Sequence, residues 1–178
     1  MSSYADNVLG RLLQWQEVRQ PPPGPLRMTL MPTNKCNLAC VHCWRHWIEY
    51  DKTCQTELSD ERLLRLVDEA AELDVQYIYF LGGGEPMTRG KLIMEMCRRL
   101  RAHGMDAGIH TNGTLFTEAM VEELVDIGIN AVYFSLDGPN AAINDRIRPN
   151  SFERATENLR RFSGSKRQKG VERPDLRM

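Results

Sequence analysis

Short apolar runs alternate with amphipathic helical segments along most of the chain, and this alternation limits the possible folds more than any other feature. In the helical segments apolar residues recur on one face, as Leu63, Leu64 and Val67 do. Four runs have the length and the aliphatic or aromatic content of strands: residues 27–31, 77–81, 106–110 and 131–136. The alternation predicts an α/β fold of parallel strands joined by right-handed helical crossovers.

The ends of the predicted helices carry capping residues. Ser59, Thr117 and Ser151 each precede a helical pattern, where a side-chain oxygen can accept a hydrogen bond from an unpaired backbone N–H group. Gly128 follows the helical pattern that begins after Thr117, at a position where a residue with a left-handed backbone commonly ends a helix. These residues set the expected helix boundaries.

The N-terminal part of the chain differs from the rest. A helix is predicted over residues 4–19, and the proline-rich segment 21–25 predicts a stiff linker after it. With 178 residues, the length suits one domain with a sizeable core. We therefore expect an N-terminal helix and linker over residues 1–25 and one core domain over residues 26–178.

Composition narrows the class of protein. The formal net charge is −1, so the overall charge gives no reason to expect a nucleic-acid partner. No stretch approaches the roughly 20 apolar residues of a membrane span, and the N-terminus has no apolar run typical of a signal peptide. The sequence thus predicts a cytoplasmic protein without a membrane partner. Thiols stay reduced there, so clustered cysteines favour a metal over a disulfide.

A polar segment follows each predicted strand. Periodicity alone does not separate a closed barrel from an open doubly wound sheet. Barrel enzymes build their sites from the loops at the carboxyl ends of many strands, whereas an open sheet more often concentrates its motif at one switch point. The segments favour a (β/α) barrel, because they follow all four strands: Cys36–Cys43, Gly82–Pro86, Thr111–Gly113 and Ser135–Gly138.

Three cysteines in the first of these loops point to chemistry. Cys36, Cys40 and Cys43 can hold three irons of a cubic [4Fe–4S] cluster, and no nearby fourth cysteine follows to close the site on the last iron. An open iron can bind a substrate or cofactor. The alternative is a zinc-binding structural module that uses His42, His46 or Cys54, but such sites usually have a second, distant cysteine pair.

The segment from Asn34 to Cys43 resembles the signature loop of the radical S-adenosylmethionine (radical SAM) superfamily. Members often have an aromatic residue before the last cysteine, and His42 is also planar. The resemblance implies a partial TIM-like (β/α) barrel, normally of six strands. It also implies an oxidoreductase-type reaction, in which a reduced cluster passes an electron to S-adenosylmethionine. Cleavage then gives a 5′-deoxyadenosyl radical, which abstracts hydrogen from a substrate.

The second motif is Gly83-Gly84-Glu85-Pro86. Glycines permit positive φ and a close approach of the backbone to a ligand, but a plain glycine turn has the same composition. A phosphate loop is disfavoured, because no Lys-Ser/Thr pair follows and a carboxylate repels phosphate. The resemblance implies that this segment binds the amino group of S-adenosylmethionine, and a carboxylate suits that ammonium.

Two later motifs extend the expected cofactor site. Thr111 and Asn112 begin a triplet that is either a simple Asn-Gly turn or, by the resemblance, a segment near the cofactor. The resemblance also places Ser135 and Asp137 beside the cofactor. Arg148 ends a segment similar to a His-Asp-x-Ile-Arg pattern, with Asn144 in place of the histidine, and either pairs with the cofactor carboxylate or makes a surface salt bridge.

Three other residues could carry chemistry. Cys97 lies on the apolar side of a predicted helix and is expected in the core. Cys54 is either incidental or a thiol near the substrate. The sequence leaves open whether His110 faces the core or the site.

The sequences of the cysteine loop and of Ser135–Gly138 look most like those of the radical SAM branch that modifies peptides and matures cofactors. That resemblance implies an electron donor such as flavodoxin or ferredoxin, and a substrate that could be a peptide. A fifth strand would begin only near Leu176, which leaves no length for the rest of a six-stranded barrel. We therefore expect a barrel truncated after about four βα units, inactive or dependent on a partner when alone. The fourth strand would be an unpaired apolar edge prone to self-association.

Overall fold

The computed structural model describes residues 4–19, 24–46 and 56–178. Five parallel strands form one sheet in the order β1-β2-β3-β4-β5, which confirms the α/β fold with parallel strands. The strands are β1 (Arg27–Leu30), β2 (Tyr77–Phe80), β3 (Asp106–Thr111), β4 (Ala131–Phe134) and β5 (Asp175–Arg177). The helices are α1 (Tyr4–Val18), η1 (Trp44–His46), α3 (Asp60–Glu72), η2 (Pro86–Arg89), α4 (Gly90–Ala102), α5 (Glu118–Ile127), α6 (Ala141–Ile147) and α7 (Phe152–Lys169).

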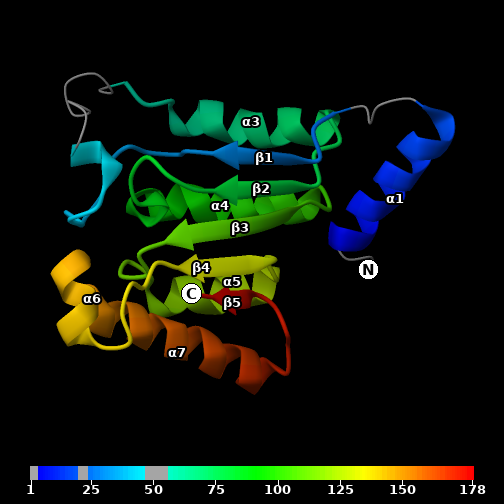
Figure 1. Cartoon of the computed structure of the whole chain (residues 1–178). Coiled ribbons are helices and arrows are strands. Elements are labelled where there is room, and N and C mark those ends of the chain that lie inside the picture. The colour runs from blue at the N-terminus through cyan, green and yellow to red at the C-terminus, as the bar shows by residue number, and fades with distance from the viewer. Residues whose placement is uncertain (1–3, 20–23, 47–55) are drawn as a thin grey trace.

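All five strands run the same way, so their carboxyl ends share one edge of the sheet. In Figure 1 this edge is at the left, where the loop after β1, the short helix η1 and α6 also lie. Helix α1 lies at the opposite edge. The topology therefore gathers the polar loops that follow the strands on one side of the molecule.

The two faces of the sheet have different chemistry. On one face Ile78, Phe80 and Ile109 are fully buried in the hydrophobic core, together with apolar residues of the helices. Alternate positions point to the other face, where His110 and Tyr133 are paired in register and only partly buried. The hydrophobic effect thus fixes the sheet against its helices and leaves the second face polar and aromatic.

Most predicted caps are confirmed. The Ser59 Oγ accepts a hydrogen bond from the Arg62 backbone N–H at 3.2 Å, and Gly128 ends α5 with a φ of +67°. The Ser151 side chain makes no capping bond, so that part of the prediction is wrong. Its place is taken by Asp145, whose Oδ1 accepts hydrogen bonds from the backbone N–H groups of Ser151 and Phe152.

The expectation that β4 is an unpaired edge is wrong. Strand β5 pairs with it in parallel, with Leu176 in register with Val132. Strand β5 is only three residues long, yet it covers the backbone donors and acceptors of β4. The fifth strand that the sequence suggests near Leu176 is therefore present and begins at Asp175.

Helix α1 is attached to the core through a charged contact. The Arg11 guanidinium donates a hydrogen bond to the Asp74 carbonyl at 2.7 Å and forms an ion pair with its carboxylate. Apolar side chains of α1 stay largely exposed, with Leu9 and Leu13 at 57% and 50% of their full accessibility. No helix within the described ranges is long and apolar enough to span a bilayer. The linker residues 20–23, like Cys54, lie outside the described residues.

Candidate active site

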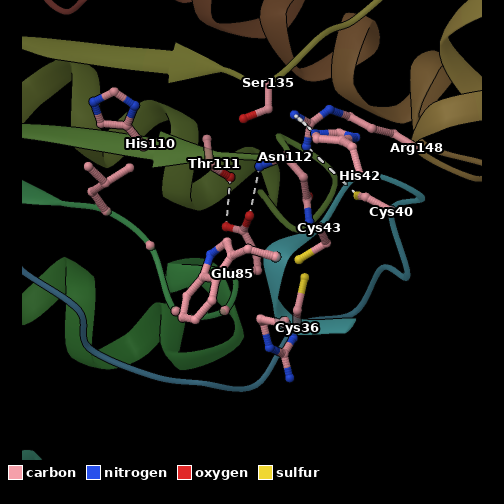
Figure 2. A pocket seen from close by; sticks show the side chains of 16 residues that line it. Cys36, Cys40, His42, Cys43, Glu85, His110, Thr111, Asn112, Ser135 and Arg148 are labelled. Atoms are coloured by element: carbon pink, nitrogen blue, oxygen red, sulfur yellow. Dashed lines mark hydrogen bonds between the residues drawn. The ribbon is translucent and has the colours of Figure 1, made fainter. Parts of the chain in front are cut away.

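A cavity of about 320 Å³ opens at the carboxyl edge of the sheet. Its walls come from the loops after β1 to β4 and from the end of α6, and Figure 2 shows their side chains. Of the predicted site residues, those that line it are Cys36, Cys40, Cys43, Gly83, Gly84, Glu85, Thr111, Asn112, Ser135 and Arg148. Pro86 and Asp137 are not in the lining. Pro86 is buried at the start of η2. The Asp137 carboxylate accepts a hydrogen bond from Arg148, which itself lines the cavity.

The three loop cysteines are free thiols on the wall of this cavity. In Figure 2 the sulfur atoms of Cys36 and Cys43 point toward each other, and Cys40 lies beside Arg148. Among the described residues, no three cysteine, histidine or acidic side chains stand close enough to hold a single metal ion. A cubic cluster makes a different demand, because each thiolate binds its own iron. Three thiols on one cavity wall fit that group.

Burial affects the acidity of these thiols. Desolvation raises the pKa of the Cys36 and Cys40 thiols, and the nearby Arg148 guanidinium partly opposes the rise at Cys40. Metal ligation needs thiolates, so iron binding here would release protons. Cys97, by contrast, is fully buried in the core, and burial raises its thiol pKa to about 12, in line with its predicted structural role.

The glycine-rich loop packs directly on the cysteine loop. The Gly84 N–H donates to the Thr33 carbonyl at 2.8 Å, and the Glu85 N–H donates to the Lys35 carbonyl at 2.9 Å. A Cβ atom on Gly84 would lie 1.9 Å from the Lys35 carbonyl oxygen, far inside contact distance. Gly83 adopts a φ of +65°, which disfavours other residues. The structure therefore gives the two glycines a role in joining the loops.

Glu85 connects the ends of β2 and β3. Its side chain is 3% exposed, and its Oε1 accepts hydrogen bonds from the Met87 N–H at 3.0 Å and the Thr111 hydroxyl at 2.7 Å. Its Oε2 accepts from the Asn112 N–H at 2.7 Å (Figure 2). Burial raises the pKa of the Glu85 carboxyl, and these three donors partly offset the rise. A carboxylate can accept about four hydrogen bonds, so some capacity is left for a ligand.

Asn112 ties the third strand end to the cysteine loop. Its Nδ2 donates to Asn37 Oδ1 at 2.9 Å, and Asn37 Nδ2 donates in turn to Thr114 Oγ1 at 2.9 Å. The Thr114 N–H and hydroxyl both donate to Asn112 Oδ1. Each polar atom of the two amides is thus bound, and the cysteine loop is fixed against the loop after β3.

Arg148 contacts the cysteine loop from the side of α6. Its Nε donates to Asp137 Oδ2 at 2.5 Å, and its Nη1 lies 3.8 Å from the Cys40 sulfur. Its Nη2 lies 3.4 Å from His42 Nε2. The salt bridge that the sequence left as one alternative is therefore present, but it lies at the cavity with the Arg148 side chain 17% exposed.

Several cavity residues were missed or left undecided by the sequence. His110 lines the cavity, and its ring stacks on Tyr133 at 4.1 Å between centroids with an angle of 1°. Burial lowers the pKa of its imidazole. Trp44 and Arg45 also line the cavity. Only their position directly after Cys43 could have pointed to these two residues, because they belong to no motif.

The fold and the site together indicate a class of protein. Thiols and a glycine-rich loop lie at the carboxyl edge of a parallel α/β sheet, where enzymes built on parallel strands place their active sites. The family model of the radical SAM superfamily matches residues 30–169. The chain therefore belongs to the radical SAM superfamily, whose members use a [4Fe–4S] cluster and S-adenosylmethionine.

Its relatives include proteins that mature cofactors and modify peptides. The chain is 37% identical over 107 residues to the tungsten-containing aldehyde ferredoxin oxidoreductase cofactor-modifying protein of Pyrococcus furiosus, covering 59% of this chain and 29% of that protein. It is 37% identical over 128 residues to the PqqA peptide cyclase of Granulibacter bethesdensis, covering 72% and 32%. The chain thus spans about a third of the length of these curated relatives.

Solved structures agree on the fold. The structure of anSMEcpe with bound AdoMet (S-adenosylmethionine) superposes with a TM-score of 0.68 at 22% sequence identity, covering 85% of this chain and 42% of that one. At this identity the likeness concerns the fold alone. It confirms the expected radical SAM type of α/β fold.

Proposed function

We propose that the chain is a radical SAM enzyme domain that binds its cluster and S-adenosylmethionine in the cavity at the carboxyl edge of the sheet. The observation that carries this proposal is the convergence of three thiols and four successive strand ends on one cavity. In the family, the bound cluster and S-adenosylmethionine supply a 5′-deoxyadenosyl radical that removes hydrogen from a substrate.

Cys36, Cys40 and Cys43 would hold the cluster, each through its thiolate, and leave one iron without a cysteine ligand. The thiols are supported on two sides: Asn112 holds Asn37 of their loop, and the Val41 N–H donates to a carbonyl of α6 at 2.9 Å. Such preorganised support keeps the donors in place when the metal is loaded.

The remaining predicted residues would frame S-adenosylmethionine. Gly83, Gly84 and Glu85 offer carbonyl and carboxylate acceptors suited to its ammonium group, and Glu85 also fixes Thr111 and Asn112 at the wall. Pro86, buried at the start of η2, would act by stiffening this loop. Ser135 can donate to a ribose or carboxylate oxygen from the end of β4. Asp137 would act through Arg148, whose Nε donates a hydrogen bond to the Asp137 carboxylate.

The electron donor and the substrate class are also part of this proposal. An external one-electron donor such as flavodoxin or ferredoxin would reduce the cluster, and the cytoplasm would keep the thiols reduced. The relative named PqqA peptide cyclase favours a peptide as the substrate class. The division into residues 1–25 and 26–178 and the low activity expected of the chain alone also stay predictions.

Anaerobic reconstitution tests the proposal. The reconstituted chain should contain about four irons and four sulfides. With dithionite it should convert S-adenosylmethionine to methionine and 5′-deoxyadenosine, measured by chromatography, at the low rate expected of the chain alone. A Cys36→Ala, Cys40→Ala, Cys43→Ala triple variant should lose iron and cleavage, whereas Cys97→Ala, altered in the core, should keep the iron. A wild-type chain that holds only zinc would contradict the proposal.

A further inference from the structure

Arg148 makes contacts that binding of a cofactor carboxylate does not explain. The guanidinium is directed at the cysteine loop: Nη1 is 3.8 Å from Cys40 Sγ and Nη2 is 3.4 Å from His42 Nε2. A guanidinium stays charged at any ordinary pH and presents five N–H donors in a fixed plane. The structure thus places a permanent positive charge and a sulfur-directed donor beside one proposed cluster ligand.

The guanidinium is oriented by Asp137. The Arg148 Nε donates to Asp137 Oδ2 at 2.5 Å, and the same carboxylate lies 4.0 Å from His42 Nε2. The Asp137 backbone N–H donates to Asn144 Oδ1 at 3.0 Å, and Asn144 is fully buried. A buried amide therefore holds the backbone of Asp137, and the Asp137 carboxylate sets the direction of the guanidinium, which makes Asp137 a positioning residue.

The backbone around Arg148 is held in the same frame. The Arg148 N–H donates to the Asn144 carbonyl at 2.8 Å, and the Ser151 hydroxyl donates to the Arg148 carbonyl at 2.8 Å. The Ile147 carbonyl accepts from the Val41 N–H at 2.9 Å, so the residue next to Cys40 is bonded to the residue next to Arg148. The contact between guanidinium and sulfur is thus fixed by bonds on both sides.

We propose that Arg148 sets the reduction potential of the cluster, by donating to the Cys40 thiolate and by holding a positive charge beside it. The proposal rests on the proposed function, because it requires the cluster. Reduction adds one electron from an external donor, and the added negative charge is shared by the cluster and its thiolates. Hydrogen bonds to sulfur and nearby positive charge favour the reduced state, so Arg148 raises the potential.

Loss of the arginine should make the cluster harder to reduce for two reasons. Arg148→Gln removes the positive charge, and it leaves the Asp137 carboxylate without its partner near the thiols. Both changes disfavour an added electron. Arg148→Lys keeps a charge but loses the planar fork that reaches Asp137 and Cys40 together, so its potential should lie between those of wild type and Arg148→Gln.

The test is a redox titration of the reconstituted chain, followed by electron paramagnetic resonance without S-adenosylmethionine. Omitting the cofactor removes any contribution from a carboxylate bound to Arg148. At a fixed solution potential, Arg148→Gln should lower the ratio of reduced to oxidised cluster at least tenfold, about 59 mV for a one-electron couple. Arg146→Gln is the matched control, since it removes the same charge from an exposed position of α6 outside the cavity. Its ratio should change less than twofold.

Iron and sulfide contents separate the possible failures. A wild-type chain that takes up no cluster contradicts the proposed function itself. If wild type and Arg148→Gln both hold a full cluster with equal potentials, the role of Arg148 is refuted while the proposed function stands. Equal shifts in Arg148→Gln and Arg146→Gln would also refute it, because the effect would then reflect overall charge and not the contact with Cys40.

Discussion

Replacing Glu85 should destabilise the fold itself, in addition to any effect on cofactor binding. In Glu85→Ala three buried donors lose their acceptor: the N–H groups of Met87 and Asn112 and the Thr111 hydroxyl. Each unsatisfied buried donor costs about 1–3 kcal/mol, so the loss should be about 3 kcal/mol or more. For a chain of this size that lowers the melting temperature by roughly 6–12 °C.

Thermal unfolding followed by circular dichroism measures this loss. Glu85→Gln keeps the shape but supplies only one acceptor oxygen, so it should lose about 1–3 kcal/mol. Glu172→Gln is the control, because this residue is exposed near the C-terminus. The expected order of melting temperatures is Glu172→Gln, Glu85→Gln, Glu85→Ala, from high to low. If Glu85→Ala melts within about 2 °C of the control, the bonding role of Glu85 is wrong.

The pH dependence provides a second check on the Glu85 environment. Burial raises the pKa of this carboxyl in the folded chain above its unfolded value of about 4.3. Its contribution to stability is therefore fully present below that value and is lost as pH rises through the folded pKa. In urea unfolding, the stability advantage of wild type over Glu85→Gln should shrink as pH rises from about 5. An advantage that grows with pH would mean that the three donors outweigh burial.

Two further perturbations follow from the structure. Gly84→Ala should separate the glycine and cysteine loops, because its Cβ would lie 1.9 Å from the Lys35 carbonyl oxygen. We expect a lower melting temperature and less iron uptake. Gly164→Ala is the control, since this helical glycine has open space around it and the substitution should be neutral or slightly stabilising. Burial lowers the pKa of the His110 imidazole, so stability should fall as pH drops below about 6.5. In urea titrations between pH 7 and 5, His110→Gln should lose less stability than wild type, and an equal loss would contradict this reading.

The sequence predicts those parts of the fold that depend on local patterns. The four strands, the caps at Ser59 and Gly128 and the placement of motifs after strands all follow from residues close together in the chain. Strand β5 was only suggested, because three residues carry almost no periodic signal. Its pairing with β4 depends on the packing of α7, which brings the end of the chain back to the sheet.

The sequence likewise predicts some features of the site and misses others. Motif spacing identifies the three cysteines and the glycine loop, but the contacts that arrange them join residues far apart in sequence. The bond from Asn112 to Asn37 spans 75 residues, and the contact from Arg148 to Cys40 spans 108. Helix α6, with its buried Asn144, was not predicted, because seven residues rich in polar side chains give no helical face. These contacts required the folded chain.

The central claim is that three cysteines hold a cluster whose remaining iron binds S-adenosylmethionine beside Glu85, Asn112 and Ser135. Electron paramagnetic resonance of the reduced, reconstituted chain tests it most directly, with spectra recorded before and after S-adenosylmethionine is added. Ligation at the open iron changes the electronic environment of the cluster, so we predict a changed spectrum. A spectrum that stays the same at saturating S-adenosylmethionine, on a chain with full iron and sulfide content, would contradict the claim.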